Sequence, residues 1–137
     1  MLIDAGPLVS LCDRKQPTHT RCQAVLEAAT APLISTWACF VEAMYLVGRI
    51  GGFRLQEHLW ALLNRGIVRL HEHSEAERRQ MAALMDRYQN VPMDLADASL
   101  VSTAETLGDR DVFTLDADFQ VYRLADGGAF EIVPELP

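Results

Sequence analysis

The sequence contains a single lysine, Lys15, among its 12 basic residues. A receiver-type phosphorylation module needs a lysine late in the chain, and a phosphate-binding P-loop needs one after a glycine. Lys15 fits neither position, and no G-x-G-x-x-G loop occurs. Phosphatases of the haloacid-dehalogenase type need D-x-D after the first strand, whereas Gly6 stands at the third position. These classes of phosphate-handling protein are therefore excluded.

Cysteines are also scarce, and their spacing does not suggest a metal site or a disulfide. There are three, Cys12, Cys22 and Cys39, with no C-x-x-C pair among them. An odd number without pairing argues against a disulfide framework or a thiolate zinc site. Buried, reduced thiols in a cytoplasmic protein are the expectation.

No apolar run reaches the roughly 18 residues that a membrane span requires. The first residues are apolar but include Asp4 and have no basic leader, so a signal peptide is not expected. No segment is rich enough in Pro, Gly or Ser to form a linker. We therefore expect one domain over residues 1–137, in the cytoplasm and not in a membrane.

The net charge of −7 is unusual for a protein that binds a polyanion such as RNA. Eleven of the 12 basic residues are nevertheless arginines, which suit phosphate. A metal-binding carboxylate cluster would itself account for part of the acidic excess.

Apolar runs of strand length alternate with helical patterns along the chain. Strands are predicted at residues 2–3, 32–34, 67–70, 111–115 and 130–133. Helices are predicted at residues 18–29, from 37 to a break at 51–52, and at 54–64, 74–88, 94–107 and 119–124. Such alternation favours the α/β class, with a mainly parallel sheet of about five strands covered by helices on both faces.

Several acids lie where acids are uncommon. Asp4 is the only charged residue before residue 13 and directly follows the first strand. In parallel sheets, functional groups gather beyond the carboxyl ends of the strands, although Asp4 could also start a turn with Gly6 and Pro7. Glu42 is the only charged residue between Trp37 and Val47. It needs a partner or a metal, unless it lies on a narrow exposed edge of its helix.

Two further pairs of acids follow in the second half of the chain. Asp94 and Asp97 are three residues apart and share one face at the start of a helix, where capping is the simpler explanation. Asp116 and Asp118 follow the strand that ends at Leu115, and Asp118 could cap a helix that begins at Phe119. Converging carboxylates repel one another and need a cation. Oxygen ligands without Cys or His favour Mg²⁺ or Mn²⁺, which activate water and stabilise phosphodiester charge.

At this point the sequence resembles the PIN-domain family, in particular the VapC toxins of bacterial VapBC toxin–antitoxin pairs. The similar segments are MLIDAGPLVSLCD, STWACFVEAMYL, PMDLADASLVSTAE and VFTLDADFQVYR. Their order and spacing cover essentially the whole chain. The resemblance implies a three-layer α/β/α fold.

The resemblance also implies a function and a set of site residues. Asp4, Glu42, Asp97 and Asp116 would be the catalytic, metal-binding quartet of an Mg²⁺- or Mn²⁺-dependent endoribonuclease. Asp94, Asp118 and Thr114 would be auxiliary. The partners implied are an RNA substrate, a cognate antitoxin whose tail enters the active-site groove, and a second copy of the chain. The helices between residues 40 and 63 have more apolar residues than a core-facing stripe needs, and we expect a dimer face there.

One departure from the family keeps an alternative open. Many members carry Thr or Ser after the first Asp, whereas this chain has Ala5-Gly6. A catalytically silent PIN-like module that binds RNA or a protein is the alternative function. His71 and His73, two apart and with no third ligand nearby in sequence, are predicted to be surface residues. Asp13 and Glu27 are expected on solvent-facing positions.

Overall fold

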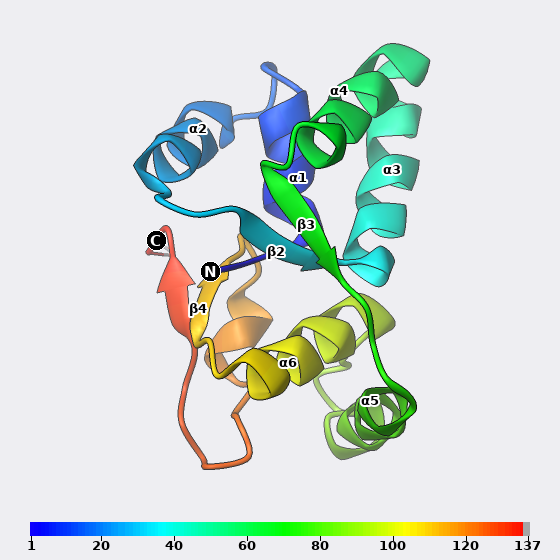
Figure 1. The fold of residues 1–137 in the computed structure, drawn as a ribbon, viewed down its shortest axis with the longest axis vertical. Coiled ribbons are helices and arrows are strands. Elements are labelled where there is room, and N and C mark those ends of the chain that lie inside the picture. Colours follow the sequence, from blue (N-terminus) through cyan, green and yellow to red (C-terminus); the bar gives the residue numbers. More distant parts are fainter. Residues whose placement is uncertain (136–137) are drawn as a thin grey trace.

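The computed structural model describes residues 1–135, so the last two residues of the expected domain, 136–137, lie outside the described part (Figure 1). The strands are β1 (Leu2–Ile3), β2 (Leu33–Thr36), β3 (Val68–His71), β4 (Asp111–Phe113) and β5 (Glu131–Val133). The helices are α1 (Ala5–Cys12), α2 (His19–Ala28), α3 (Trp37–Gly51), α4 (Phe53–Asn64), α5 (Glu75–Arg87) and α6 (Leu95–Leu107). A 3₁₀ turn, η1, spans Ala117–Gln120.

The five strands form one sheet in the order β3-β2-β1-β4-β5. All four neighbouring pairs are parallel, with Leu2 facing both Ile34 and Val112 at the centre. Helices α1 to α4 lie on one side of the sheet, and α5 and α6 lie on the other (Figure 1). The predicted three-layer α/β/α class with a parallel sheet is therefore confirmed.

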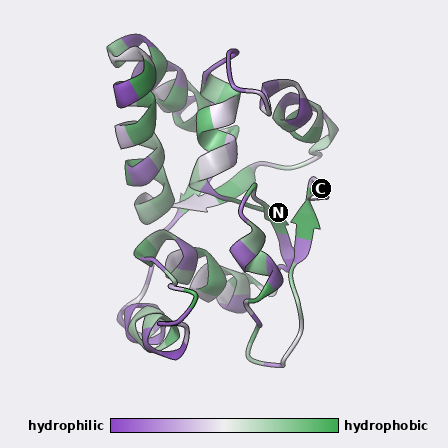
Figure 2. Cartoon of the chain, turned by 180° about the vertical axis from the view of Figure 1, so that it is seen from behind, coloured by the Kyte–Doolittle hydropathy of each residue, from purple (hydrophilic) through white to green (hydrophobic). Residues whose placement is uncertain are grey.

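The core follows from the apolar faces of these elements. Both residues of β1 are fully buried, as are Val112 and Phe113 of β4. In α6, nine consecutive residues, 96–104, are buried, so this helix is enclosed on all sides along that stretch. Figure 2 shows hydrophobic residues along the strand segments, and mixed hydrophobic and hydrophilic residues along the surrounding helices. A sheet covered on both faces requires apolar strands and amphipathic helices. Among residues 1–135, no helix is both long and apolar enough to cross a membrane.

Polar side chains fix where the helices begin. Thr36 caps α3 by accepting a hydrogen bond from the backbone of Cys39, and its hydroxyl also bonds Ser99 of α6 at 2.7 Å. In α5, Ser74 and Glu77 form a reciprocal capping box. Gly108 ends α6 in the left-handed conformation, with φ of 64°. These contacts set the positions from which the functional side chains project.

Two features differ from the sequence prediction. Helix α1 was not expected, because Gly6 and Pro7 suggested a turn; Pro7 lies in the first helical turn, where its missing N–H has no intrahelical partner to lose. The helix predicted at residues 119–124 is instead the shorter turn η1, which begins two residues earlier. Asp116, and not Asp118, caps it.

Candidate active site

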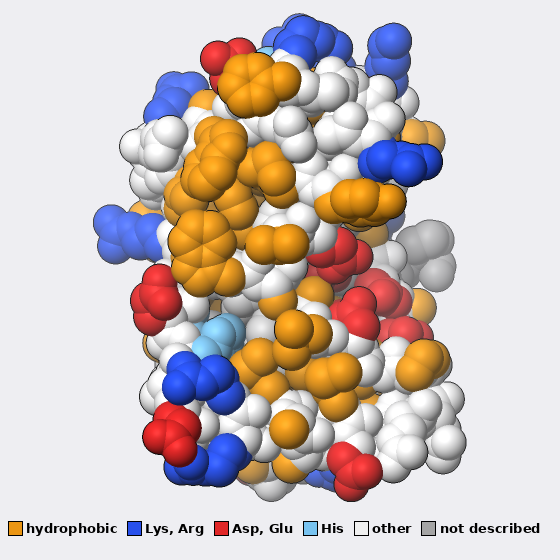
Figure 3. Space-filling view, turned by 90° about the vertical axis from the view of Figure 1, so that its right-hand side faces the viewer, with side chains coloured by type: hydrophobic (Ala, Val, Ile, Leu, Met, Phe, Trp, Pro, Cys, Tyr) orange, Lys and Arg blue, Asp and Glu red, His pale blue; other side chains and the backbone are white. Residues whose placement is uncertain are grey.

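A pocket of about 350 Å³ lies where the carboxyl ends of β1 and β4 meet the first turns of α1 and α6 and the side of α3. Five carboxylates line it: Asp4, Glu42, Asp94, Asp97 and Asp116. The remaining lining residues are Ala5, Gly6, Leu46, Leu115 and Ala117, so no basic side chain of the described residues belongs to the lining. In the face shown by Figure 3, acidic side chains gather beside a larger hydrophobic area. The structure thus brings together all four predicted metal ligands and the auxiliary Asp94.

Asp4 is held firmly at the floor of this pocket. It follows β1 directly and caps α1, and its Oδ1 accepts a hydrogen bond from the backbone of Ala5 at 2.6 Å. Its Oδ2 accepts one from the hydroxyl of Thr114 at 2.8 Å. Thr114 thereby supplies a hydroxyl to the first carboxylate, although the position after Asp4 is Ala5. Burial raises the pKa of Asp4, and the charges of Asp116 and Asp94 raise it further against these two hydrogen bonds.

Glu42 projects into the pocket from the middle of α3. Its side chain is exposed, as an edge position predicts, but it also lines the pocket. Partial burial raises its pKa, and so do the charges of Asp94, Asp4 and Asp116. The two interpretations of Glu42 therefore describe the same position: an exposed helix edge that faces other carboxylates.

The sequence left open whether Asp94 and Asp97 cap a helix or belong to the acidic site, and the two residues differ in this respect. Asp94 is the exposed N-cap of α6, accepting a hydrogen bond from the backbone of Asp97 at 2.8 Å. Asp97 itself is buried and does not cap, and its Oδ2 accepts a hydrogen bond from the hydroxyl of Tyr122 at 2.8 Å. Burial raises the pKa of Asp97 to about 7, and the charges of Asp94, Asp4 and Asp116 add to it against the Tyr122 bond.

Tyr122 is a site residue that the sequence did not reveal. Its ring is fully buried, and its hydroxyl reaches a carboxylate 25 residues away in the chain. A buried tyrosine needs a partner for its hydroxyl, but no local pattern says which residue that partner is. Cys39 is another such neighbour, with its thiol 3.9 Å from Oδ1 of Asp4.

The last two acids lie after β4. The backbone of Asp116 donates to the Thr114 hydroxyl at 3.0 Å, so that one threonine orients both Asp4 and Asp116. Asp118 does not line the pocket. Its backbone donates to Asp116 at 2.9 Å, and slight burial together with the Asp116 charge raises its pKa. Asp118 therefore contacts the site through Asp116.

The carboxylates share the pocket without closing on one another. Within residues 1–135, no three of these acids have oxygen atoms that all lie within 4.8 Å of each other. Two like charges about 4 Å apart repel by about 4 kcal/mol at an effective dielectric constant near 20, so closer convergence of these acids would need a cation. The donor set consists of oxygens only, which fits Mg²⁺ or Mn²⁺ and disfavours softer metals.

A larger cavity, of about 630 Å³, lies at the far end of α1 and has a different character. Its lining includes the basic residues Arg14, Lys15, His19, Arg54 and His58. The two histidines bond the carbonyls of Ser10 and Cys12 in the last turn of α1, at 2.7 and 3.2 Å. Basic groups at a helix C-terminus complement its dipole, so this cavity has a structural explanation and the carboxylate pocket remains the candidate active site.

Known proteins resemble this chain in sequence and in fold. No protein-family model matches the chain. Ribonuclease VapC26 of Mycobacterium tuberculosis is 27% identical over 135 residues, which cover 98% of this chain and 100% of that protein. The crystal structure of M. tuberculosis VapC20, a toxin that cleaves the sarcin–ricin loop, superposes with a TM-score of 0.81 at 15% identity, covering 88% of this chain and 92% of that one.

The fold and the similarity over nearly the full length define the class of the protein. It has a PIN-like α/β/α fold with an acidic pocket at the carboxyl edge of the sheet. The chain is thus similar over nearly its whole length to a VapC ribonuclease and has the fold of a VapC toxin, in line with the resemblance that the four sequence motifs indicated.

Proposed function

We propose that this protein is a toxin-type endoribonuclease that hydrolyses RNA phosphodiester bonds and depends on Mg²⁺ or Mn²⁺. The single observation that carries the proposal is the pocket in which five carboxylates from four separate segments meet without a basic side chain. The resemblance to a ribonuclease and to an RNA-cleaving toxin supports RNA as the substrate. An anionic pocket can receive an anionic phosphodiester only if a cation compensates the charge.

Asp4, Glu42, Asp97 and Asp116 are the residues proposed to hold the metal. When bound, the ion would supply Lewis-acid stabilisation of the phosphodiester and favour deprotonation of an attacking water. The chain's own contribution is to hold the ligands in place. Thr114 and the Ala5 backbone fix both oxygens of Asp4, and Tyr122 fixes one oxygen of Asp97. Such pre-orientation lowers the cost of assembling the site.

Purified protein should cleave a structured RNA in Mg²⁺ or Mn²⁺ and should stop in excess EDTA. Asp97→Asn or Asp4→Asn should lower the cleavage rate by at least about 10²-fold, because ligand loss removes transition-state electrostatics. Glu27→Gln, at an exposed position of α2, is the control and should leave the rate unchanged. Cleavage that persists in EDTA, or that is equal in Asp97→Asn and the parent, would contradict the proposal. RNA binding without cleavage would favour the silent module.

Two protein partners complete the proposal. We infer a cognate antitoxin whose tail enters the carboxylate pocket, and a homodimer formed through α3 and α4. These two helices expose seven large hydrophobic side chains: Trp37, Val41, Tyr45, Leu46, Ile50, Phe53 and Trp60. We call this set the α3–α4 apolar face, and Figure 3 shows the hydrophobic side chains that gather there. Exposed apolar surface of this extent on a small domain is typical of a protein–protein interface.

A further inference from the structure

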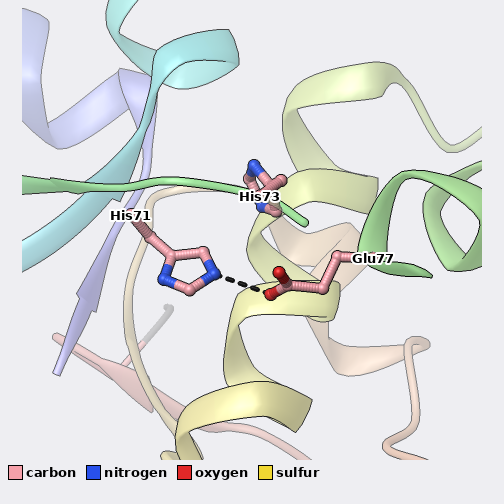
Figure 4. Close-up of side chains that lie close together, drawn as sticks. All are labelled: His71, His73 and Glu77. Carbon is pink, nitrogen blue, oxygen red and sulfur yellow. Dashed lines mark hydrogen bonds and ion pairs between the residues drawn. The ribbon is translucent and has the colours of Figure 1, made fainter. Parts of the chain in front are cut away.

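A second cluster of metal-ligating side chains lies outside the carboxylate pocket. His71 ends β3, His73 follows in the next loop, and Glu77 lies in the first turn of α5. Within residues 1–135 this is the one group of three His, Cys, Asp or Glu whose ligand atoms all lie within 4.8 Å of one another. Figure 4 shows the His71 ring directed at the Glu77 carboxylate, with the His73 ring beside them. Glu77 is thus a candidate third ligand, so the expectation that none lies nearby is wrong, while both histidines are partly exposed.

Glu77 is fixed in the orientation that a ligand needs. Its Oε2 accepts a hydrogen bond from the Ser74 backbone at 2.7 Å, and its Oε1 accepts one from the Thr106 hydroxyl at 2.6 Å. Oε1 also lies 2.6 Å from Nε2 of His71. Burial raises the pKa of Glu77, but the hydrogen bonds from Thr106, Ser74 and His71 outweigh it and lower the pKa to about 2. These hydrogen bonds therefore favour the ionised carboxylate and hold it in one orientation.

His73 is held by α6 through one of its ring nitrogens. Its Nε2 lies 3.1 Å from the carbonyl oxygen of Ser99 and 3.0 Å from the hydroxyl of Thr103. A carbonyl can only accept, so Nε2 carries the hydrogen in this contact, and the neutral ring keeps its lone pair on Nδ1. A ring nitrogen that donates to a backbone carbonyl fixes the tautomer and the plane of the ring in metal sites.

We propose that His71, His73 and Glu77 form a binding site for Zn²⁺, separate from the carboxylate pocket. Two imidazoles and one carboxylate are a ligand set that zinc accepts with a fourth position left to water. Such nitrogen donors disfavour Mg²⁺, which the carboxylate pocket suits. The ion takes the place of the hydrogen between Nε2 of His71 and Glu77. A metal-bound imidazole is neutral, so the remaining ring hydrogen of His71 is then on Nδ1, and any further proton passes to solvent. The side chains of His71 and Glu77 are 16% and 10% exposed, so an ion can reach them from solvent.

The proposed site would join three elements of the fold. It links the end of β3 to α5, while Ser99, Thr103 and Thr106 connect both to α6. Since α6 also carries Asp97, zinc at this site would stabilise the side of the sheet that supports the carboxylate pocket. We therefore expect a structural rather than a catalytic effect, in the form of a higher melting temperature with Zn²⁺.

The test is a calorimetric titration of the full chain with Zn²⁺ in excess Mg²⁺, which competes with Zn²⁺ for the carboxylate pocket. The parent should bind one Zn²⁺ per chain, and His73→Gln should weaken that binding at least about tenfold. His19→Gln is the matched control, because His19 is also part-buried and bonds a backbone carbonyl but lies outside the cluster. It should bind Zn²⁺ like the parent.

A second measurement needs no variant. Co²⁺ bound in place of Zn²⁺ should show d–d absorption without the thiolate charge-transfer bands that Cys12, Cys22 or Cys39 would produce. Asp97→Asn should retain the site, so failure of the nuclease proposal and failure of this one are distinguishable. No saturable binding by the parent, equal affinity in His73→Gln and the parent, or thiolate bands with Co²⁺ would each overturn the proposal. The cluster would then be an ion pair beside a helix cap.

Discussion

Asp97 shows how the fold changes the chemistry of a single carboxylate. Burial and three neighbouring acids raise its pKa from 3.8 to about 7. Between about pH 4 and pH 7, the folded chain therefore holds a proton that the unfolded chain has already lost. The contribution of this group to the free energy of unfolding consequently falls as the pH rises through that range. At neutral pH and above, an ionised Asp97 destabilises the metal-free fold.

Replacing Asp97 by Asn should remove this cost. At pH 8 without metal, Asp97→Asn should melt at the same temperature as the parent or a few degrees higher, since a gain of about 1 kcal/mol corresponds to about 4 °C at this size. At pH 5 the two proteins should melt closer together, because Asp97 of the parent is then mostly protonated. Mn²⁺ should raise the melting temperature of the parent at pH 8 and do less for the variant. Scanning calorimetry of both proteins at both pH values measures this.

Glu27→Gln serves as the reference, because Glu27 is exposed. Asp13, which the sequence also placed on a solvent face, is unsuitable: it is buried and accepts hydrogen bonds from Lys15 and Gln16 after α1. A variant that melts lower at pH 8, together with a parent indifferent to Mn²⁺, would mean that these acids only cap helices.

The pocket residues that directly follow a strand could be predicted from the sequence. Asp4 and Asp116 follow strands, and parallel strands bring their carboxyl ends to one edge of the sheet. Tyr122 and the group of His71, His73 and Glu77 were not predictable in the same way. Their contacts depend on how a ring is turned and on how a loop meets a helix, and neither leaves a periodic pattern in the sequence.

At the scale of elements, α6 combines a cap and a functional side chain within one turn. Asp94 accepts from the backbone of Asp97 while also lining the pocket and raising the pKa of Asp97. The cap contributes stability, whereas the charge opposes it in the absence of a cation. Substitutions that separate the two effects can measure each of them.

Asp94→Asn and Asp94→Ala both remove the charge, but only Asn keeps a capping oxygen. The Asn variant should therefore be more stable than the Ala variant by about 1 kcal/mol. Urea denaturation of the two proteins measures the difference. Asp86, exposed within α5 and not a cap, provides the matched pair. There Ala should equal or exceed Asn, because alanine has the higher helix propensity. The same order at both positions would show that Asp94 does not act as a cap.

Most element boundaries followed from local signals, such as Gly108 at the end of α6 and the break at Gly51. Helix α1 did not, because Gly6 and Pro7 are turn formers in most contexts. Its start depends on Asp4, whose side chain caps it, and on packing of its apolar residues against the sheet and α3. Tertiary contacts of this kind override local propensity.

For the whole molecule, the order of strands matters more than their number. Alternating patterns predicted the α/β class, but they did not predict that β1 lies between β2 and β4. That order brings Asp4 after β1 next to Asp116 after β4, and it places Glu42 of α3 close by, since α3 follows β2 directly. In the single chain, the side chains of the α3–α4 apolar face remain exposed.

We expect that face to mediate a homodimer, and sedimentation velocity at tens of micromolar should show the parent as a dimer. Val41 belongs to this face and is 62% exposed, so Val41→Glu should dissociate the dimer, because two carboxylates would be buried in an apolar interface. Val121→Glu makes the same change at a valine that is 51% exposed beside η1, outside the face, and should leave a dimer. Val121→Glu should melt like the parent, whereas Val41→Glu should lose the part of the melting temperature that dimerisation contributes. A monomeric parent would contradict the proposal, and so would a Val41→Glu variant that sediments as a dimer like Val121→Glu. In the second case the dimer would have to form through another surface, and the α3–α4 apolar face would be left for a different protein, with the antitoxin as the first candidate.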